Sequence, residues 1–210
     1  IVFENGGYVY RMDLSSEKAE KVPIFIHEDL VWKRGGLIDV SKGISNYEIA
    51  PDGSRALLGS RGEIFTLPAK YGNTRNLTNS SGIHERNSKW SPDGKWIAYV
   101  SDATGEEEIY IIPQDGSGPA KQLTHNSDTY KYKLLWSPDS KKILWSDKKL
   151  RLQYVDIGSE KVTLAAQAKA WEFEDFNWSP DSLWITYAQI EEDRLPTVSI
   201  YSLEKQQRIE

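Results

Sequence analysis

Three tryptophans recur at similar intervals, and indole rings are among the side chains best suited to holding a ligand by stacking. Trp90, Trp136 and Trp178 each stand directly before a Ser-Pro-Asp sequence. The fixed place of these tryptophans in the repeat favours packing in the core instead, because burying each large side chain stabilises the folded state by about 1.5 to 3 kcal/mol. We predict that these tryptophans pack between repeated units.

Four aspartates follow prolines at the same interval, and carboxylates of this kind serve elsewhere as metal ligands or general acids. They are Asp52, Asp93, Asp139 and Asp181. One carboxylate per repeat would be far from the next, whereas an aspartate after Ser-Pro stabilises a turn by accepting backbone hydrogen bonds. We predict that all four are turn residues.

The histidines and serines show no pattern typical of catalysis. His27, His84 and His125 lack the spacing of metal ligands, and His84 and His125 fall in matching loops of the repeat. No Gly-x-Ser-x-Gly nucleophile elbow and no glycine-rich phosphate loop occurs. A Ser-His-acid set assembled from distant positions is the remaining alternative, and no motif marks one. We predict no catalytic residue, metal site or cofactor in this chain.

Two acidic runs, at residues 106–108 and 191–193, could attract basic molecules. Solvated hairpin tips explain such runs more simply. The whole chain has a formal net charge of -5, with lysine and arginine scattered, so no stripe of positive charge predicts nucleic-acid binding.

Composition gives few constraints on the compartment. Cysteine is absent, so disulfides and thiolate metal sites are excluded. No apolar run approaches the roughly 18 residues of a membrane span, and Ile1 opens directly into a strand-like segment. We expect either a cytoplasmic protein or one whose leader lies upstream.

The elements that must position all these residues are strands joined by a recurring turn. Prolines 51, 92, 138 and 180 each occupy the second place of a Ser-Pro-Asp-Gly type turn, with Ala50 replacing the first serine and Ser140 and Ser182 replacing the glycine. Proline pre-sets its backbone angle, serine bonds a backbone amide, and glycine suits the exit position. Aromatic and β-branched residues alternate on both sides of the turn, as in strands.

Each repeat of 41 to 46 residues supplies about four strands. The second strands are expected at 56–58, 97–99, 143–145 and 185–187, the third at 63–67, 108–112, 152–155 and 198–201, and the fourth at 75–78, 121–124 and 161–164. The last repeat is expected to lack most of its fourth strand, and residues 163–172 are interpreted as a loop. At the chain start we expect one strand within residues 6–14 and another within 21–25.

Four strands per repeat of this length are typical of a β-propeller. A β-sandwich is the rival, but it does not explain a turn that returns at a fixed spacing. We predict an all-β, partial propeller of about four to five blade segments, with a domain boundary near the glycine pair at residues 35–36.

The segments 62–72 and 74–78, and their continuation through 85–99, resemble the propeller region of tricorn proteases. The Phe-Thr-Leu-Pro-Ala strand at 65–69 and the Thr-Arg-Asn-Leu-Thr sequence at 74–78 are its more specific features. The Ser-Pro-Asp-Gly turn is shared with TolB-like periplasmic proteins and with prolyl oligopeptidase-type propellers. The likeness extends over the whole chain.

This resemblance implies that residues 1–36 end a six-bladed propeller and that residues 37–210 open a seven-bladed one. It implies a non-catalytic part of a serine protease, a scaffold and access channel for oligopeptides, with the catalytic domain outside this chain. The implied partners are oligopeptide substrates, other domains of the same polypeptide and further copies in a homo-oligomer, with a cytoplasmic location or, alternatively, a periplasmic one. The alternatives are a TolB-like interaction module of the bacterial envelope and the propeller cap of a prolyl-oligopeptidase-type hydrolase.

Overall fold

The computed structural model describes residues 1–25, 39–40, 42–190 and 195–209. These residues form strands and turns, with no helix among them, and none therefore provides a helix that could cross a membrane. The chain divides into two compact units, Ile1–Ile38 and Asp39–Glu210. The boundary predicted at residues 35–36 lies outside the described residues.

The first unit is one antiparallel sheet of three strands, β1 (Val2–Asn5), β2 (Tyr8–Met12) and β3 (Ala19–Lys21). The strand predicted within residues 6–14 is confirmed as β2, but β1 was not predicted and the placement of the second strand within 21–25 was wrong, because β3 ends at Lys21. Gly6 and Gly7 have φ of 57° and 75°, which suits a two-residue hairpin turn, so the predicted first strand begins only at Tyr8. Residues 22–25 form no strand, and Pro23 among them has no N–H to give to a sheet.

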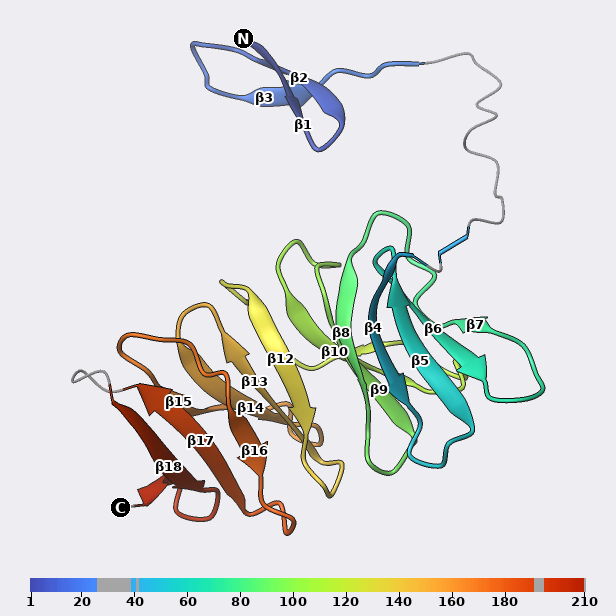
Figure 1. Cartoon of the computed structure of the whole chain (residues 1–210). Helices are drawn as coiled ribbons and strands as arrows, with labels where there is room; N and C mark the ends of the chain where they lie inside the picture. Colours follow the sequence, from blue (N-terminus) through green and yellow to red (C-terminus); the bar gives the residue numbers. More distant parts are fainter. Residues whose placement is uncertain (26–38, 41, 191–194, 210) are drawn as a thin grey trace. The chain divides into compact units, whose positions relative to one another are not determined.

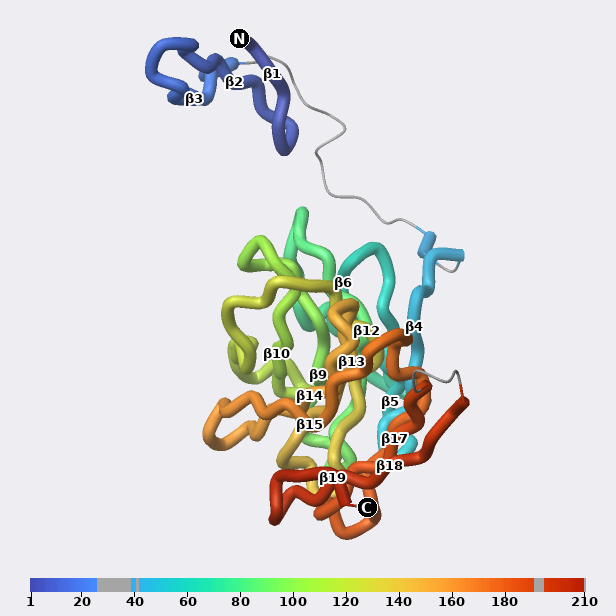
Figure 2. Tube along the Cα trace, turned by 90° about the vertical axis from the view of Figure 1, so that its left-hand side faces the viewer, coloured from blue at the N-terminus to red at the C-terminus, as the bar shows by residue number. Residues whose placement is uncertain are grey.

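The second unit consists of four antiparallel sheets of four strands each, arranged as successive blades (Figures 1 and 2). The first blade contains β4 (Ile44–Ile49), β5 (Arg55–Ser60), β6 (Glu63–Pro68) and β7 (Arg75–Asn76); the second β8 (Glu85–Trp90), β9 (Trp96–Ser101), β10 (Glu108–Pro113) and β11 (Lys121–Gln122). The third contains β12 (Lys131–Trp136), β13 (Lys142–Asp147), β14 (Arg151–Asp156) and β15 (Val162–Gln167); the fourth β16 (Phe176–Trp178), β17 (Trp184–Ile190), β18 (Pro196–Ser202) and β19 (Gln207–Ile209). Within each blade the strands pair in chain order, so the predicted propeller architecture is confirmed.

Two local assignments in this unit were wrong. The fourth strand predicted at 161–164 is present, but it continues to Gln167 into the segment interpreted as a loop at 163–172, because residues 162–167 pair with β14 as β15. The fourth blade does have a fourth strand, since Gln207–Ile209 pairs with β18.

The turns between the first two strands of each blade have the predicted hydrogen bonds. In the second blade the Gly94 amide donates to the Ser91 carbonyl at 2.9 Å, and Ser91 Oγ accepts from the Trp96 amide at the same distance. Gly94 at the exit has φ of 70°, and Ser140 takes the same left-handed conformation at 59°. Ser140 Oγ also accepts a hydrogen bond from the amide of Asp93 in the preceding blade. Ser182 does the same for Asp139, so adjacent turns are bonded to each other.

The apolar core lies between the blades. One cluster joins the first and second blades and includes Trp90, another joins the second and third and includes Trp136, and the last joins the third and fourth and includes Trp178. The three tryptophans are 6–7% exposed, which confirms that they pack in the core. Trp136 and Trp178 also donate Nε1–H bonds to carbonyls of the preceding blade.

The first strands of the blades are irregular and bonded to one another. β4, β8 and β12 each contain a register shift against their second strand, and such bulges redirect side chains. Asn46 Nδ2 donates to Ser88 Oγ at 2.7 Å, and Asn87 Nδ2 donates to the Tyr132 carbonyl at 2.6 Å. The bulged strands therefore carry polar links between neighbouring blades.

Candidate functional site

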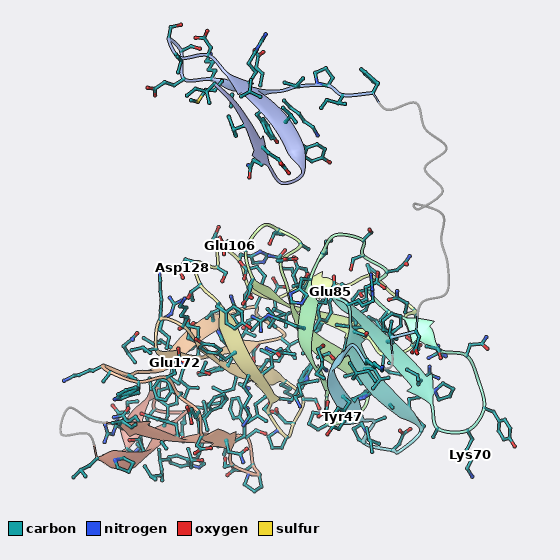
Figure 3. All side chains as sticks on the ribbon, turned by 45° about the horizontal axis from the view of Figure 1, so that its top comes forward. Tyr47, Lys70, Glu85, Glu106, Asp128 and Glu172 are labelled. Atoms are coloured by element: carbon teal, nitrogen blue, oxygen red, sulfur yellow. The ribbon has the colours of Figure 1, made fainter. Side chains whose placement is uncertain are left out.

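Polar side chains gather on the side of the second unit opposite the proline turns, which we call the crossover side. The loops that lead from one blade to the next lie there, at residues 77–84, 123–130 and 168–175. Figure 3 shows Glu85, Glu106, Asp128 and Glu172 on this side of the sheets. Clefts between the second and third blades and between the third and fourth open here, which makes this side the candidate site.

Arg86 begins a network of ionic contacts between the second and third blades. Its guanidinium pairs with Glu107 of the same blade and donates to the Lys131 carbonyl of the next blade at 2.7 Å. The guanidinium also lies over the Tyr130 ring, with Cζ 3.8 Å from the ring centroid. One arginine thus joins the start of β8 to the start of β12.

Lys131 is the buried cation of this network, with a side chain only 6% exposed. Its Nζ donates to the Glu107 carbonyl and to Ser127 Oγ, and lies 3.8 Å from Glu108 Oε2. Burial lowers the pKa of Lys131, and the neighbouring carboxylates, Glu108 first, oppose that shift. Glu108 in turn accepts from the Ser127 amide at 2.6 Å and from Thr124 Oγ1.

A second ionic group adjoins the first on the third blade. The Asp147 side chain is 1% exposed and accepts from Arg151 Nε at 2.7 Å. Arg151 also pairs with Asp128 at 3.0 Å, and Lys149 pairs with the same carboxylate. These hydrogen bonds, that from Lys149 first, lower the pKa of Asp128.

The junction between the first and second blades repeats this arrangement with one charge reversed. Thr78 and Thr124 occupy matching places, each accepting an amide bond from the third strand of its blade. Glu85 begins β8 where Lys131 begins β12, and it is 4% exposed. Its Oε1 accepts from Ser80, but Oε2 has no hydrogen-bond partner among the described residues. Burial raises the pKa of Glu85.

The aspartates and histidines singled out from the sequence are not brought together. Asp52, Asp93, Asp139 and Asp181 each accept the amide two residues ahead, which confirms the turn interpretation. His84 and His125 lie in separate crossover loops, and the described residues hold no group of three potential metal ligands. His27 and residues 191–193 lie outside the described residues.

The interpretation of residues 106–108 as a solvated tip was wrong for two of the three. Glu106 is exposed, but Glu107 pairs with Arg86 and Glu108 is 2% exposed. Four residues of the network were not predicted from the sequence: Arg86, Lys131, Asp147 and Arg151. Lys131, Asp147 and Arg151 each start or end a strand that is otherwise rich in apolar residues, whereas Arg86 lies in the polar strand β8 and had no such signal.

The Ser127 and Lys131 pair has the residue types of a Ser-Lys hydrolase dyad. A lysine must be neutral to take a proton from serine. Burial lowers the pKa of Lys131 and so favours the neutral form, while Glu108 and the Glu107 carbonyl stabilise the charged ammonium and oppose that shift. The chemistry that this arrangement supports is cross-blade charge pairing.

Successive four-stranded meanders, cores between blades and first strands side by side define the class of protein as a β-propeller. Residues 44–210 match the family model described as the tricorn protease second beta propeller domain. The chain therefore belongs to the tricorn second-propeller family.

Individual relatives agree with that assignment. A tricorn protease homolog of Saccharolobus solfataricus is 27% identical over 188 residues, covering 90% of this chain and 17% of the relative. The crystal structure of the tricorn protease matches 99% of this chain and 20% of its own, with a TM-score of 0.72 and 19% identity. A putative TolB from Agrobacterium tumefaciens matches 99% of this chain and 74% of its own, with a TM-score of 0.60 and 19% identity, a likeness of fold alone. The chain thus spans about a fifth of the length of its tricorn relatives.

Proposed function

We propose that this chain supplies a non-catalytic propeller portion of a tricorn-like serine protease and that it guides oligopeptides to or from a catalytic domain elsewhere in a longer polypeptide. The observation that carries the proposal is the family match over residues 44–210. The longer protein would be cytoplasmic and homo-oligomeric, and residues 1–36 would close a preceding six-bladed propeller while residues 37–210 open a seven-bladed one.

The first strands offer chemistry suited to passing peptides. They lie at the inner edge of the blades and carry asparagine, serine and tyrosine at and near the bulges. Asn177 in β16 and Lys133 in β12 are exposed. Such side chains can exchange hydrogen bonds with any peptide backbone without selecting one sequence strongly.

A blocking experiment in the longer protease tests this proposal. The chain has no cysteine, so once any cysteines in the rest of the longer protease have been replaced, Asn177→Cys can be labelled selectively with a bulky maleimide on the inner strand. We expect labelling to slow degradation of long peptides while a short fluorogenic peptide is cleaved at its normal rate. Lys161→Cys, exposed at the start of an outer strand, is the matched control and should leave both rates unchanged. Equal rates for the two labelled variants on long peptides would contradict the proposal.

A TolB-like interaction module and a prolyl-oligopeptidase-type cap are the alternatives. The TolB likeness is 19% identical, whereas the family match is to a tricorn domain. A periplasmic location of the longer protein, found by fractionation, would favour the TolB-like alternative.

A further inference from the structure

The hairpin that joins β1 to β2 contains the one Asn-Gly pair of the sequence, Asn5-Gly6. An asparagine before a glycine can cyclise, because the backbone nitrogen that follows attacks the side-chain amide carbon and glycine has no side chain to hinder that approach. The product is a five-membered imide, and its hydrolysis leaves an acid in place of the amide. In a folded protein the rate depends on how firmly the two reacting groups are held.

Neither reacting group at Asn5-Gly6 is held by a hydrogen bond. Asn5 is exposed, and neither its side-chain amide nor the backbone N–H of Gly6 has a hydrogen-bond partner among the described residues. A Cβ placed at Gly6 or Gly7 would meet no atom within 4 Å, so solvent surrounds this turn. The nitrogen, the amide carbon and water can therefore meet without any part of the fold opening.

Three Asp-Gly pairs, which could form the same imide by losing water, are protected by their turns. They lie at residues 52–53, 93–94 and 115–116. Each of their glycine amides donates to a carbonyl of its own turn, at 2.8 to 3.0 Å. Each aspartate Oδ1 also accepts the amide two residues ahead. An amide held in this way must be released by local opening before its nitrogen can react, and that requirement slows the reaction.

We propose that Asn5 deamidates spontaneously in the folded protein and that the product detaches β1 from its sheet. The Gly6 nitrogen loses its proton and bonds to Cγ of Asn5, the Cγ–Nδ2 bond breaks, and the Nδ2 group takes up a proton and leaves as ammonia. Water then adds to one of the two imide carbonyls. Addition at Cγ breaks the new N–Cγ bond and gives aspartate. Addition at the backbone carbonyl breaks its bond to the Gly6 nitrogen and gives isoaspartate, in which the chain runs through Cβ and Cγ.

Isoaspartate lengthens the backbone by one carbon at the point that sets the register of β1. Asn5 pairs with Tyr8 and closes the hairpin, so the added carbon shifts every later pair of the two strands. All four residues of β1 are exposed, and a sheet of three short strands has little stability in reserve. The inference concerns the first unit alone and does not rest on the proposed function.

Ageing of the whole 210-residue chain at pH 8, followed by trypsin digestion and mass spectrometry, tests the reaction. Asn5 is the one amide side chain in peptide 1–11, which should gain about 1 Da and separate into aspartate and isoaspartate forms. The rate for Asn5 should differ by less than about threefold between the folded chain and the chain in guanidinium chloride, because the fold does not protect it. A peptide 1–11 that reacts only in denaturant would overturn the proposal.

Asn126 is the matched control within the same digest. The amide of the next residue, Ser127, donates to Glu108 at 2.6 Å, so deamidation of Asn126 should be about tenfold or more faster in denaturant than in the folded chain. Equal rates for Asn5 and Asn126 in the folded chain would contradict the claim that the free amide of Gly6 makes Asn5 the reactive site.

Hydrogen exchange over residues 1–12 tests the detachment of β1. Asn5→Asp carries the charge of the product on an unaltered backbone, so it separates the effect of charge from that of the added carbon. We expect the isoaspartate form of the aged chain to exchange its β1 and β2 amides about tenfold faster than the fresh chain, and Asn5→Asp to exchange at the fresh rate. Equal exchange by the isoaspartate form and Asn5→Asp would overturn the detachment of β1.

Discussion

At the scale of single residues, the junction of the first and second blades differs from that of the second and third in whether a buried carboxylate has a cation beside it. Glu85 and Glu108 are both almost fully buried. Glu108 lies beside Lys131 and accepts two hydrogen bonds, while one oxygen of Glu85 has no partner among the described residues. The same residue type should therefore stabilise the protein at one junction and destabilise it at the other at neutral pH.

Glu85→Gln tests this difference. Because burial raises the pKa of Glu85 in the folded state, the folded state holds its proton more tightly than the unfolded state does. Glu85 therefore stabilises the folded state at pH values below its pKa in the unfolded chain. That contribution is lost as the pH rises through its pKa in the folded protein. We expect Glu85→Gln to raise the free energy of unfolding at pH 7 by about 1 kcal/mol, with the gain disappearing in acid.

Glu108→Gln is the matched control, measured by urea unfolding under the same conditions. Removing a charge from a buried pair leaves Lys131 without its counter-ion, so the free energy of unfolding should fall by about 3 kcal/mol. A loss of stability in both variants at pH 7 would show that Glu85 has a partner after all.

At the scale of elements, each blade is tied to the next through its turn as well as through its core. The Asp93 and Asp139 amides donate to Ser140 and Ser182 in the next turn. Gly94, the matching residue of the second blade, has no side chain to accept such a bond. Ser140 and Ser182 thus have an unfavourable left-handed backbone conformation, and the hydrogen bond between blades offsets its cost.

Two substitutions at Ser140 separate these effects. Ser140→Ala removes the bond and keeps the strained backbone, so the free energy of unfolding should fall by about 1 kcal/mol. Ser140→Gly removes the same bond but relieves the backbone, and its stability should lie close to that of the wild type. Thermal unfolding of the two variants measures the difference in stability between them. A glycine variant that is less stable than the alanine variant would contradict this explanation.

The blades themselves could be predicted from the sequence because their turns have local chemistry. Serine and aspartate accept hydrogen bonds from amides within five residues, and proline fixes its own backbone angle, so each turn can be recognised without knowledge of the fold. Strand β19 was missed because it is short and two of its three residues are polar. The strand predicted at 161–164 is the start of β15, and its extension to Gln167 was missed because a short run such as Thr163 to Gln167 fits several structures.

The ionic network could not be predicted in the same way. Arg86 and Lys131 are 45 residues apart, and their contact depends on how bulged first strands face each other across a cleft. The run at 106–108 carries no sign of which carboxylate faces solvent. The burial of Glu108 follows from its place as the first residue of β10 beside the crossover loop.

At the scale of the whole molecule, the first and fourth blades each have an outer face that no described residue covers. Tyr47 and Ile49 on β4 are 79% and 70% exposed, and Val198 on β18 is 76% exposed. Sheets with exposed apolar faces tend to associate. These faces are consistent with further blades in the longer protein that we propose.

The isolated chain should therefore self-associate in solution. Light scattering should give a mass above 24.0 kDa that rises with concentration. Ile49→Lys together with Val198→Lys should shift the chain towards the monomer. Tyr71→Lys, at a loop residue that is 94% exposed, is the control and should not. A wild-type monomer at all concentrations would favour a self-sufficient module.

The central claim is that this chain contributes architecture and peptide access and does not cleave peptides itself. The most direct measurement is turnover of fluorogenic peptides by the purified chain beside its Ser127→Ala variant, since Ser127 and Lys131 are the one Ser-Lys contact described at the crossover side. We expect no turnover above the buffer rate for either protein. Turnover by the wild type that Ser127→Ala abolishes would contradict the claim and make the chain an enzyme in its own right.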